Sequence, residues 1–385
     1  PGVPENNEAV TASARVSDPD GVASVKLFYR TETPVGAFTQ VNMTDADADG
    51  VYTAPIPGQV LGIRVLFYIE AADGSGAVSL FPTDVFERTH PPIVDPSSPA
   101  PNDYLYCMYR HDTRIVSTSN HSYRFVLNQP TQDYLATRRR HSNEMVDGTF
   151  IFGSGDVYYN AQLRFAGSPW LREANFNNSY SIKMPKDKPL HDRKKAFNLD
   201  AHGPDGRERI SHYLMRQSAG NTTLPYFDGF TLVRFQLNNV KDATFEALDK
   251  PNSQYISFWF PGADDVPFFE MFDRVSFNDS GDRSGIADGR VQYPPYGTTG
   301  GTNRENYRWF FSPRSDESAD DFSPFQLLCQ VMDEGVTSNA AFDTAIWSYL
   351  DVEEVLRVWA IEMNIDDWDT WCGNRGKNCY SYGSP

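Results

Sequence analysis

A run of prolines divides the sequence into two parts of different character. Residues 89–103, THPPIVDPSSPAPND, contain five prolines. Proline fixes its own backbone torsion and donates no amide hydrogen, so such a run cannot continue a helix or a central strand. It predicts a semi-rigid extended linker over residues 91–103. We therefore expect one domain over residues 1–90 and a larger one over residues 104–385.

The first part has the pattern of an all-β module. Apolar or alternating runs at Ala12–Val16, Val25–Tyr29 and Val60–Tyr68 are separated by turn clusters rich in aspartate, glycine and serine. Short strands at this spacing predict a small β-sandwich. The segment DPDGVASVKLFYR and the turn before GVYTAPIP resemble fibronectin-III or immunoglobulin-like modules of bacterial surface proteins.

An acidic stretch in this part, Asp45–Gly50, begins like a calcium-binding EF-hand loop. The twelfth position of the loop is Ile56, where an EF-hand needs a bidentate glutamate. We interpret the stretch as an acidic hairpin turn, with weak surface binding of Ca²⁺ as the alternative.

The second part has the pattern of an α+β domain. Residues Val157–Phe165 alternate between apolar and polar, which predicts a half-buried strand. Residues 205–219 carry a helical stripe behind Asp205 and Glu208, which form a capping-box pattern. Further strands are expected at Tyr180–Met184, Phe230–Leu237 and Tyr255–Phe260. Residues 278–306 have the composition of a surface excursion.

The C-terminal hundred residues predict helices. Apolar stripes run over Phe325–Met332 and Phe342–Tyr349, and a third runs from the capping residue Asp351 to Met363. The expected fold class is therefore α+β, an N-terminal β-sandwich followed by strands and then helices. That is the order of a two-lobed, atypical protein-kinase-like domain.

The charge of the chain excludes one class of partner. The net charge is −17, whereas a protein that binds nucleic acid needs a basic footprint. Residues 101–220 hold 17 basic and 12 acidic side chains, and residues 221–385 hold 12 basic and 26 acidic ones. This division suits an anionic ligand held between two unlike lobes, or it is a chance segregation of solvated charges. No stretch approaches 18 consecutive apolar residues, so no transmembrane helix is expected.

The four cysteines are Cys107, Cys329, Cys372 and Cys379. Their spacings do not fit a zinc site. Two disulfides, with Cys372–Cys379 as a local clip and Cys107 and Cys329 as the remaining pair, would indicate an oxidising, extracytoplasmic compartment. Four unrelated buried thiols are the alternative.

Residues 364–382 combine the residue types of phosphoryl transfer. The end of a helix is followed by an aspartate-rich loop, an asparagine and an aromatic strand. In phosphoryl transfer an aspartate accepts the proton of the attacking hydroxyl, and a downstream asparagine holds Mg²⁺. Loops rich in aspartate and asparagine are also common after ordinary helices, so a purely structural loop remains open.

Five short motifs occur in order between residues 104 and 385. They are YYNAQLRFAGS at 158–168, NSYSIKM at 178–184, KKAFNL at 194–199, a helix opened by LDV at 350–352, and the DWD loop at 367–369 with its later asparagine. This series resembles the CotH kinase-like family, the spore-coat-protein-H type of atypical secreted protein kinase. The resemblance implies a kinase-like fold that uses ATP and Mg²⁺, or Mn²⁺ in its place.

The resemblance also implies roles for single residues. Asp369 would be the catalytic aspartate, and Asn378 would be a metal ligand. Lys183 would bind the phosphates of ATP, with Arg164 and Ser168 in a turn close to them. The residues alone leave Lys183 open as an exposed strand lysine and Arg164 as a cross-strand ion-pair partner.

Two further elements match the family less well. Glu208 is a poor match to the acidic partner of the lysine, because His212 and Tyr213 occupy the helix face where an acid is expected. The run Arg138–His141 is most simply a solvated basic loop, with substrate docking as the alternative.

The sequence departs from the family at its end. The second metal-binding aspartate of the family follows the last strand, and the sequence stops at Pro385 before such a residue, on a strand that we expect to have no partner. The chain also opens at Pro1 without an initiator methionine. We expect a polypeptide that has been cut, or a second chain that completes the C-terminal lobe; loss of catalysis is the remaining alternative.

The expected function is an extracytoplasmic, secreted or cell-surface protein kinase that modifies Ser/Thr of surface or coat proteins. The alternative is a catalytically incomplete, kinase-like surface or matrix protein that acts as a binding or assembly module. The partners are accordingly a protein substrate or a surface or coat assembly partner.

Overall fold

The fold is taken from a computed structural model of the chain. The residues described are 2–34, 36–82, 106–113, 121–153, 155–168, 172–173, 175–190, 194–201, 207–219, 231–262, 266–272, 274–278, 283–287, 304–308, 310–315, 319–365 and 379–382. The chain forms two compact units. The first unit comprises residues 1–205 and 229–248, and the second comprises residues 206–228 and 249–385.

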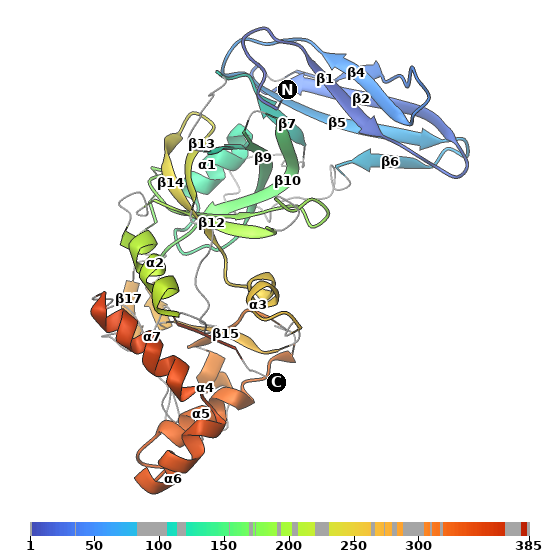
Figure 1. The fold of residues 1–385 in the computed structure, drawn as a ribbon. Coiled ribbons are helices and arrows are strands. Elements are labelled where there is room, and N and C mark those ends of the chain that lie inside the picture. Colours follow the sequence, from blue (N-terminus) through green and yellow to red (C-terminus); the bar gives the residue numbers. More distant parts are fainter. Residues whose placement is uncertain are drawn as a thin grey trace. The chain divides into compact units, whose positions relative to one another are not determined.

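The first unit begins with the expected β-sandwich (Figure 1). One layer is the antiparallel pair β1 and β4, and the other has the order β3-β2-β5-β6. Inward side chains such as Leu27, Ile56 and Val65 are buried between the layers. The bounds are β1 Val10–Arg15, β2 Val22–Thr31, β3 Thr39–Asn42, β4 Val51–Ile56, β5 Arg64–Asp73 and β6 Val78–Phe81.

The sheet of the sandwich extends beyond residue 90. Strand β7, Cys107–Arg110, pairs with the first half of β5, and β6 pairs with the second half. Phe67 lies opposite Cys107 and Ile69 lies opposite Phe81, so β6 and β7 follow one another along a single edge of β5. The expected linker, residues 91–103, lies outside the described residues.

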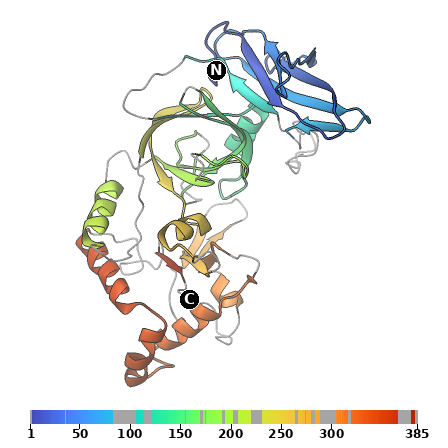
Figure 2. The same cartoon turned by 45° about the vertical axis from the view of Figure 1, so that its right-hand side comes forward.

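The rest of the first unit is a closed barrel of seven strands, in the order β10-β11-β12-β14-β13-β8-β9 (Figure 2). Alternation fills its interior with side chains, among them Phe125, Tyr180 and Phe235, each completely buried. The parallel pairing of β8 with β13 joins strands far apart in the chain. The bounds are β8 His121–Val126, α1 Gln129–Thr137, β9 Val146–Phe152, β10 Asp156–Phe165, β11 Tyr180–Lys183, β12 Ala196–Asp200, β13 Thr231–Leu237 and β14 Lys241–Asp249.

A polar joint ties the sandwich to the barrel. The Arg64 guanidinium and the Glu32 carboxylate form an ion pair in which both side chains are about nine-tenths buried. The second oxygen of Glu32 accepts from the backbone N–H of Gln129 at 2.5 Å, in the first turn of α1. Arg64 also donates to Oε1 of Gln129 at 2.7 Å. The two parts of the first unit are thus held together by hydrogen-bonded charges.

The second unit combines small sheets with helices. Its core packs Phe269, Phe311 and Phe325 together. The bounds are α2 Arg207–Ala219, α3 Ser253–Trp259, β15 Phe268–Met271, β16 Arg274–Phe277, β17 Arg283–Ala287, α4 Glu305–Arg308, β18 Phe311–Pro313, α5 Ser323–Met332, α6 Asn339–Ala345, η4 Ile346–Ser348, α7 Val352–Asn364 and β19 Cys379–Tyr382.

The α+β class and most expected elements are confirmed. Helix α2 lies where the stripe at 205–219 predicts it, and Asp351 caps α7 by accepting from the N–H of Glu354 at 3.0 Å. Two expectations are wrong. Residues Tyr255–Trp259 belong to helix α3 rather than a strand, with Phe260 as the C-cap, because Asn252 caps a helical turn by accepting from the N–H of Tyr255. Strand β19 has a partner, since it pairs with β15.

The expectation about membrane-spanning helices is confirmed for the described residues. None of the helices found there combines the length and the apolar character that crossing a bilayer requires.

Candidate functional site

Two of the expected site residues, Arg164 and Lys183, lie on the outer face of strands β10 and β11. A third, Ser168, lies just after the end of β10. Leu163 and Phe165 point into the barrel, so the residues between them point outward. Gln162 lies opposite Lys183, and Arg164 lies opposite Ser181. Lys183 and Arg164 are therefore diagonal neighbours on one outer face, close enough for long side chains to reach a common ligand. Ser168 follows, half-buried, after the turn at Gly167.

A buried arginine organises the turn beside this face. Arg172 is 5% exposed and donates to the backbone carbonyls of Gly167 and Ser142 at 3.0 and 2.9 Å. It also donates to Oδ1 of Asn143 at 2.9 Å. Arg164 donates to the same oxygen of Asn143 at 3.2 Å. Asn143 thus holds two guanidinium groups side by side.

A third cation lies close to this pair. The pKa of Arg172 is lowered to about 10, first by burial and then by the positive charges of Arg164 and Arg138. Arg138 lies over the ring of Tyr134, and its Nη1 donates to the carbonyl of Glu144 at 2.6 Å. We call Arg138, Arg164 and Arg172 the arginine cluster.

The arginine cluster has the chemistry of an anion site. In the described part of the chain, the acceptors of Arg172 are carbonyl and amide oxygens and no carboxylate. A lowered pKa on an arginine means that its charge is poorly compensated where it lies. A bound anion, and a phosphate above all, would compensate this positive charge through charge-assisted hydrogen bonds.

The interpretation of Arg138–His141 as a solvated loop is too simple. Arg138 caps the C-terminus of α1, and its backbone N–H donates to the carbonyl of Tyr134. The carbonyl of Arg140 accepts from Arg172 at 3.3 Å. The loop therefore forms one wall of the arginine cluster, whereas Arg139 is exposed.

The residues expected to hold the metal and to catalyse transfer lie in a part of the chain that the structure does not describe. Asp369, Asn378 and Cys372 lie outside the described residues. Glu208 lies on α2 of the second unit, and its side chain is outside the described set as well.

The disulfide expected between Cys107 and Cys329 is wrong. Cys107 is completely buried in the sandwich core of the first unit, and Cys329 in the core of the second. Among the described cysteines, none is in a disulfide, Cys379 included. Burial raises the pKa of the Cys107 thiol well above its ordinary value, which keeps it protonated and unreactive.

The acidic stretch Asp45–Gly50 forms the expected hairpin turn. One oxygen of Asp45 accepts from the N–H of Asp49 at 3.2 Å, and the other accepts from the N–H of Gly50 at 3.0 Å. Oxygens of Asp45, Asp47 and Asp49 lie within 4.8 Å of one another. The backbone thus already uses the carboxylate that an EF-hand would turn toward calcium.

Sequence reasoning missed Arg172 and Asn143, which organise the site. The sequence offered one signal for Arg172: it follows Arg164 by eight residues, on the other side of a turn that contains Gly167. Asn143 gave no signal, because its role depends on bringing residues 143, 164 and 172 together.

Comparisons with known proteins do not identify a family. No protein-family profile and no curated protein matches the chain. Among solved structures, the cycloalternan-degrading enzyme from Trueperella pyogenes aligns with 64% of this chain at 8% identity and a TM-score of 0.19. This chain covers 29% of that enzyme's length. A likeness at that level says nothing about the function of this chain.

Proposed function

We propose that the chain is a kinase-like phosphotransferase whose barrel binds the phosphates of ATP at the arginine cluster. The observation that carries the proposal is the shared oxygen of Asn143, which holds Arg164 and Arg172 together beside an exposed lysine on the neighbouring strand. Arg164 and Lys183 are the residues for which the sequence motifs predict contact with phosphate. Their placement on one outer face supports that role.

The division of labour within the cluster follows from burial. Arg172 is held by four residues and orders the turn, so it positions the site. Arg164 and Lys183 are more exposed and are the groups that reach an incoming phosphate. Phosphoryl transfer depends mainly on positioning and charge neutralisation, which cationic side chains provide.

The remaining roles follow from the sequence motifs. Asp369 would accept the proton of a Ser or Thr hydroxyl on a surface or coat protein, and Asn378 would hold Mg²⁺ or Mn²⁺. The bound nucleotide supplies the phosphoryl group. The proposed setting is extracytoplasmic, at the cell surface or in a secreted coat.

Nucleotide binding tests the proposal. We expect isothermal titration to detect binding of MgATP, and Arg164→Ala and Lys183→Ala each to weaken it about tenfold or more, as loss of a hydrogen bond to a charged group requires. Arg234→Ala is the matched control, since it removes an arginine from β13 of the same barrel. No binding of MgATP, or equal losses in Arg164→Ala and Arg234→Ala, would refute the phosphate site.

Phosphate transfer tests the chemistry separately. We expect Asp369→Asn to abolish transfer from labelled ATP to protein while binding of MgATP stays within about twofold, because the aspartate acts on the hydroxyl and the cluster acts on the phosphates. Transfer that survives in Asp369→Asn would remove that residue from the mechanism.

A second function is favoured by a different observation. In the part of the chain that the structure describes, strand β1 has an edge without a paired strand, next to an apolar groove. Such a feature suits a surface or matrix protein that assembles with other chains. Binding of MgATP by the wild-type chain without any transfer would favour this assembly function.

A further inference from the structure

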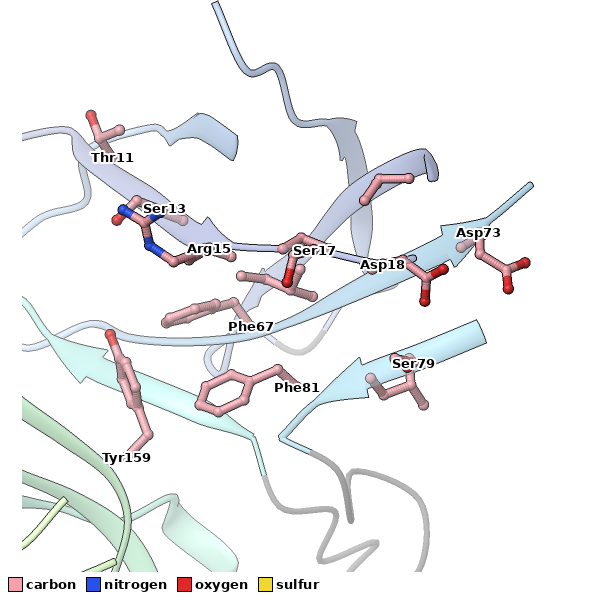
Figure 3. Close-up of a pocket in the computed structure, with 18 of the residues that line it drawn as sticks. Thr11, Ser13, Arg15, Ser17, Asp18, Phe67, Asp73, Ser79, Phe81 and Tyr159 are labelled. Carbon is pink, nitrogen blue, oxygen red and sulfur yellow. The ribbon is translucent and has the colours of Figure 1, made fainter. Parts of the chain in front are cut away.

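The two layers of the sandwich are unequal, and a groove follows from the mismatch. The layer β1-β4 has two strands and faces the longer sheet β3-β2-β5-β6. The uncovered part is a groove of about 660 Å³ between β1 and β6, closed at one end by Tyr159 of the barrel (Figure 3). Every residue from Val10 to Asp18 lines it. The groove therefore follows the full length of β1.

The edge of β1 that faces the groove has its backbone groups available. In the described part of the chain, β4 alone pairs with β1. Thr53 lies opposite Ser13, yet its N–H and carbonyl bond to Thr44 at 2.9 and 3.0 Å. Residues at odd positions in β1 therefore do not bond across this pair, and their N–H and carbonyl groups point to the other edge. These residues are Thr11, Ser13 and Arg15.

The floor of the groove leaves room for side chains from outside. Small residues, Ala12 and Ala14 on β1 and Ala71 and Ser79 on β5 and β6, lie in its lining beside larger ones such as Ile69. An added strand would lie about 4.8 Å from β1 and would place alternate side chains over this floor. Large apolar side chains at those positions would complete the thin layer of the sandwich.

The two ends of the groove differ in character. Asp18 and Asp73 lie at one end, and Phe67, Phe81 and Tyr159 gather toward the other (Figure 3). Carboxylate oxygens of Asp18, Asp20 and Asp73 lie within 4.8 Å of one another. A basic group placed at that end would be attracted by three carboxylates.

We propose that the groove binds an extended segment of a partner protein, which adds to β1 as an antiparallel strand. The segment has large apolar side chains at alternate positions and a lysine or arginine at its N-terminal end. Strand β1 runs toward Asp18, so an antiparallel segment begins at the acidic end. Main-chain hydrogen bonds to Thr11, Ser13 and Arg15 provide affinity, and the floor and the acidic end provide selectivity.

The probe is the labelled peptide Lys-Val-Thr-Val-Thr-Val-Thr-Val, and the measurement is fluorescence anisotropy with the full chain. We expect saturable binding, at least tenfold weaker binding for the peptide with glutamate in place of lysine, and weaker binding for the reversed sequence. Failure of all three peptides to bind, or equal binding by all three, overturns the proposal.

Variants on the edge itself separate docking from folding. Ser13→Pro removes an N–H that faces the groove and leaves the bonds between β1 and β4 in place, as proline does on an edge strand. We expect it to abolish peptide binding, while Ser13→Thr keeps it and both variants melt within a few degrees of the wild type. Asp18→Lys should reduce the preference for the lysine peptide over the glutamate peptide, because a lysine then stands beside the two remaining carboxylates, Asp20 and Asp73. Binding by Ser13→Pro equal to the wild type overturns the proposal.

Two further outcomes would identify a different occupant. Hydrogen exchange should show unprotected amides at Thr11, Ser13 and Arg15 in the chain alone and protected ones with the peptide. Protection without the peptide means that this chain covers its own edge, which overturns the proposal. A dimer in light scattering that Ser13→Pro dissociates assigns the groove to a second copy and overturns it as well.

Discussion

The barrel and the sandwich of the first unit are both built from strands, but they differ in their strand edges. The sheet of the barrel is closed, whereas the sheets of the sandwich are open. The barrel closes on itself, and its interior is filled by completely buried aromatic side chains such as Tyr180 and Phe235. Among the residues that the structure describes, no strand pairs with the outer edge of β1, which lies above a groove lined in part by alanines. Phe81 at the rim of that groove is 45% exposed.

The difference separates two kinds of surface available for recognition. A closed barrel offers no backbone edge, so its outer face can act only through side chains, as the arginine cluster does. An open sandwich offers its main chain, which binds extended segments with little regard to their sequence. In our proposals, one unit of this protein thus combines a side-chain site for anions with a backbone site for strands.

The largest expected effect comes from deleting the same side chain in both regions. Phe235→Ala should lower the free energy of unfolding by about 3–5 kcal/mol, because the closed interior cannot collapse around the cavity. Phe81→Ala should cost less than about 1.5 kcal/mol, because much of that ring already contacts water. Urea unfolding monitored by circular dichroism measures both. Equal losses would mean that the sandwich is packed as tightly as the barrel.

An intermediate effect is expected at the joint between the two regions. Glu32→Gln leaves the buried Arg64 without its charge partner, which should cost about 3 kcal/mol. Lys26 and Glu70 form a matched pair within the sandwich, but it is more exposed, so Glu70→Gln should cost less than about 1 kcal/mol. We also expect Glu32→Gln to split one thermal transition of the first unit into two. A single unshifted transition would show that the joint does not couple the regions.

The smallest effect is expected on the outer wall of the barrel, at Asp242. The hydrogen bond from Arg234 is the main cause that holds the pKa of Asp242 below its ordinary value. Its ionised form therefore stabilises the folded state at neutral pH, and this contribution is lost as the pH falls through the lowered pKa. Asp242→Asn should remove less than about 1 kcal/mol at pH 7 and flatten the loss of stability below pH 4. A wild-type slope in acid that Asp242→Asn does not change would contradict this assignment.

The sequence predicts individual elements of the fold better than their connections. Alternation over Val157–Phe165 and the cap at Asp351 are local signals, and both lead to the observed elements. Closure of the barrel is not local, since it depends on β8 pairing with β13. The helix at Ser253–Trp259 was missed because its aromatic run fits a strand as well, and only the cap at Asn252 distinguishes the two.

The candidate site follows the same rule. Arg164, Ser168 and Lys183 lie in short motifs that can be recognised one by one, and the register of β10 and β11 brings two of them to one face. The position of Arg172 after the turn is a weak signal in the sequence, but its contribution arises from burial and from Asn143 as a shared acceptor, which only the fold brings about. The free edge of β1 is also invisible in the sequence, because an unpaired strand and a paired one have the same alternation.

The arrangement of β6 and β7 along one edge of β5 bears on how the N-terminal module could be separated from its neighbour. A fragment that ends at residue 90 would lack Cys107–Arg110 and would leave one edge of Arg64–Phe67 without a partner, while β2 still pairs with the other edge. A protease nick between residues 82 and 106 would yield two fragments that remain associated through the same ladder of hydrogen bonds. The sandwich therefore cannot be exchanged as a separate domain by cutting at the proline-rich segment. Its last strand, β7, follows that segment in the sequence and would stay with the barrel.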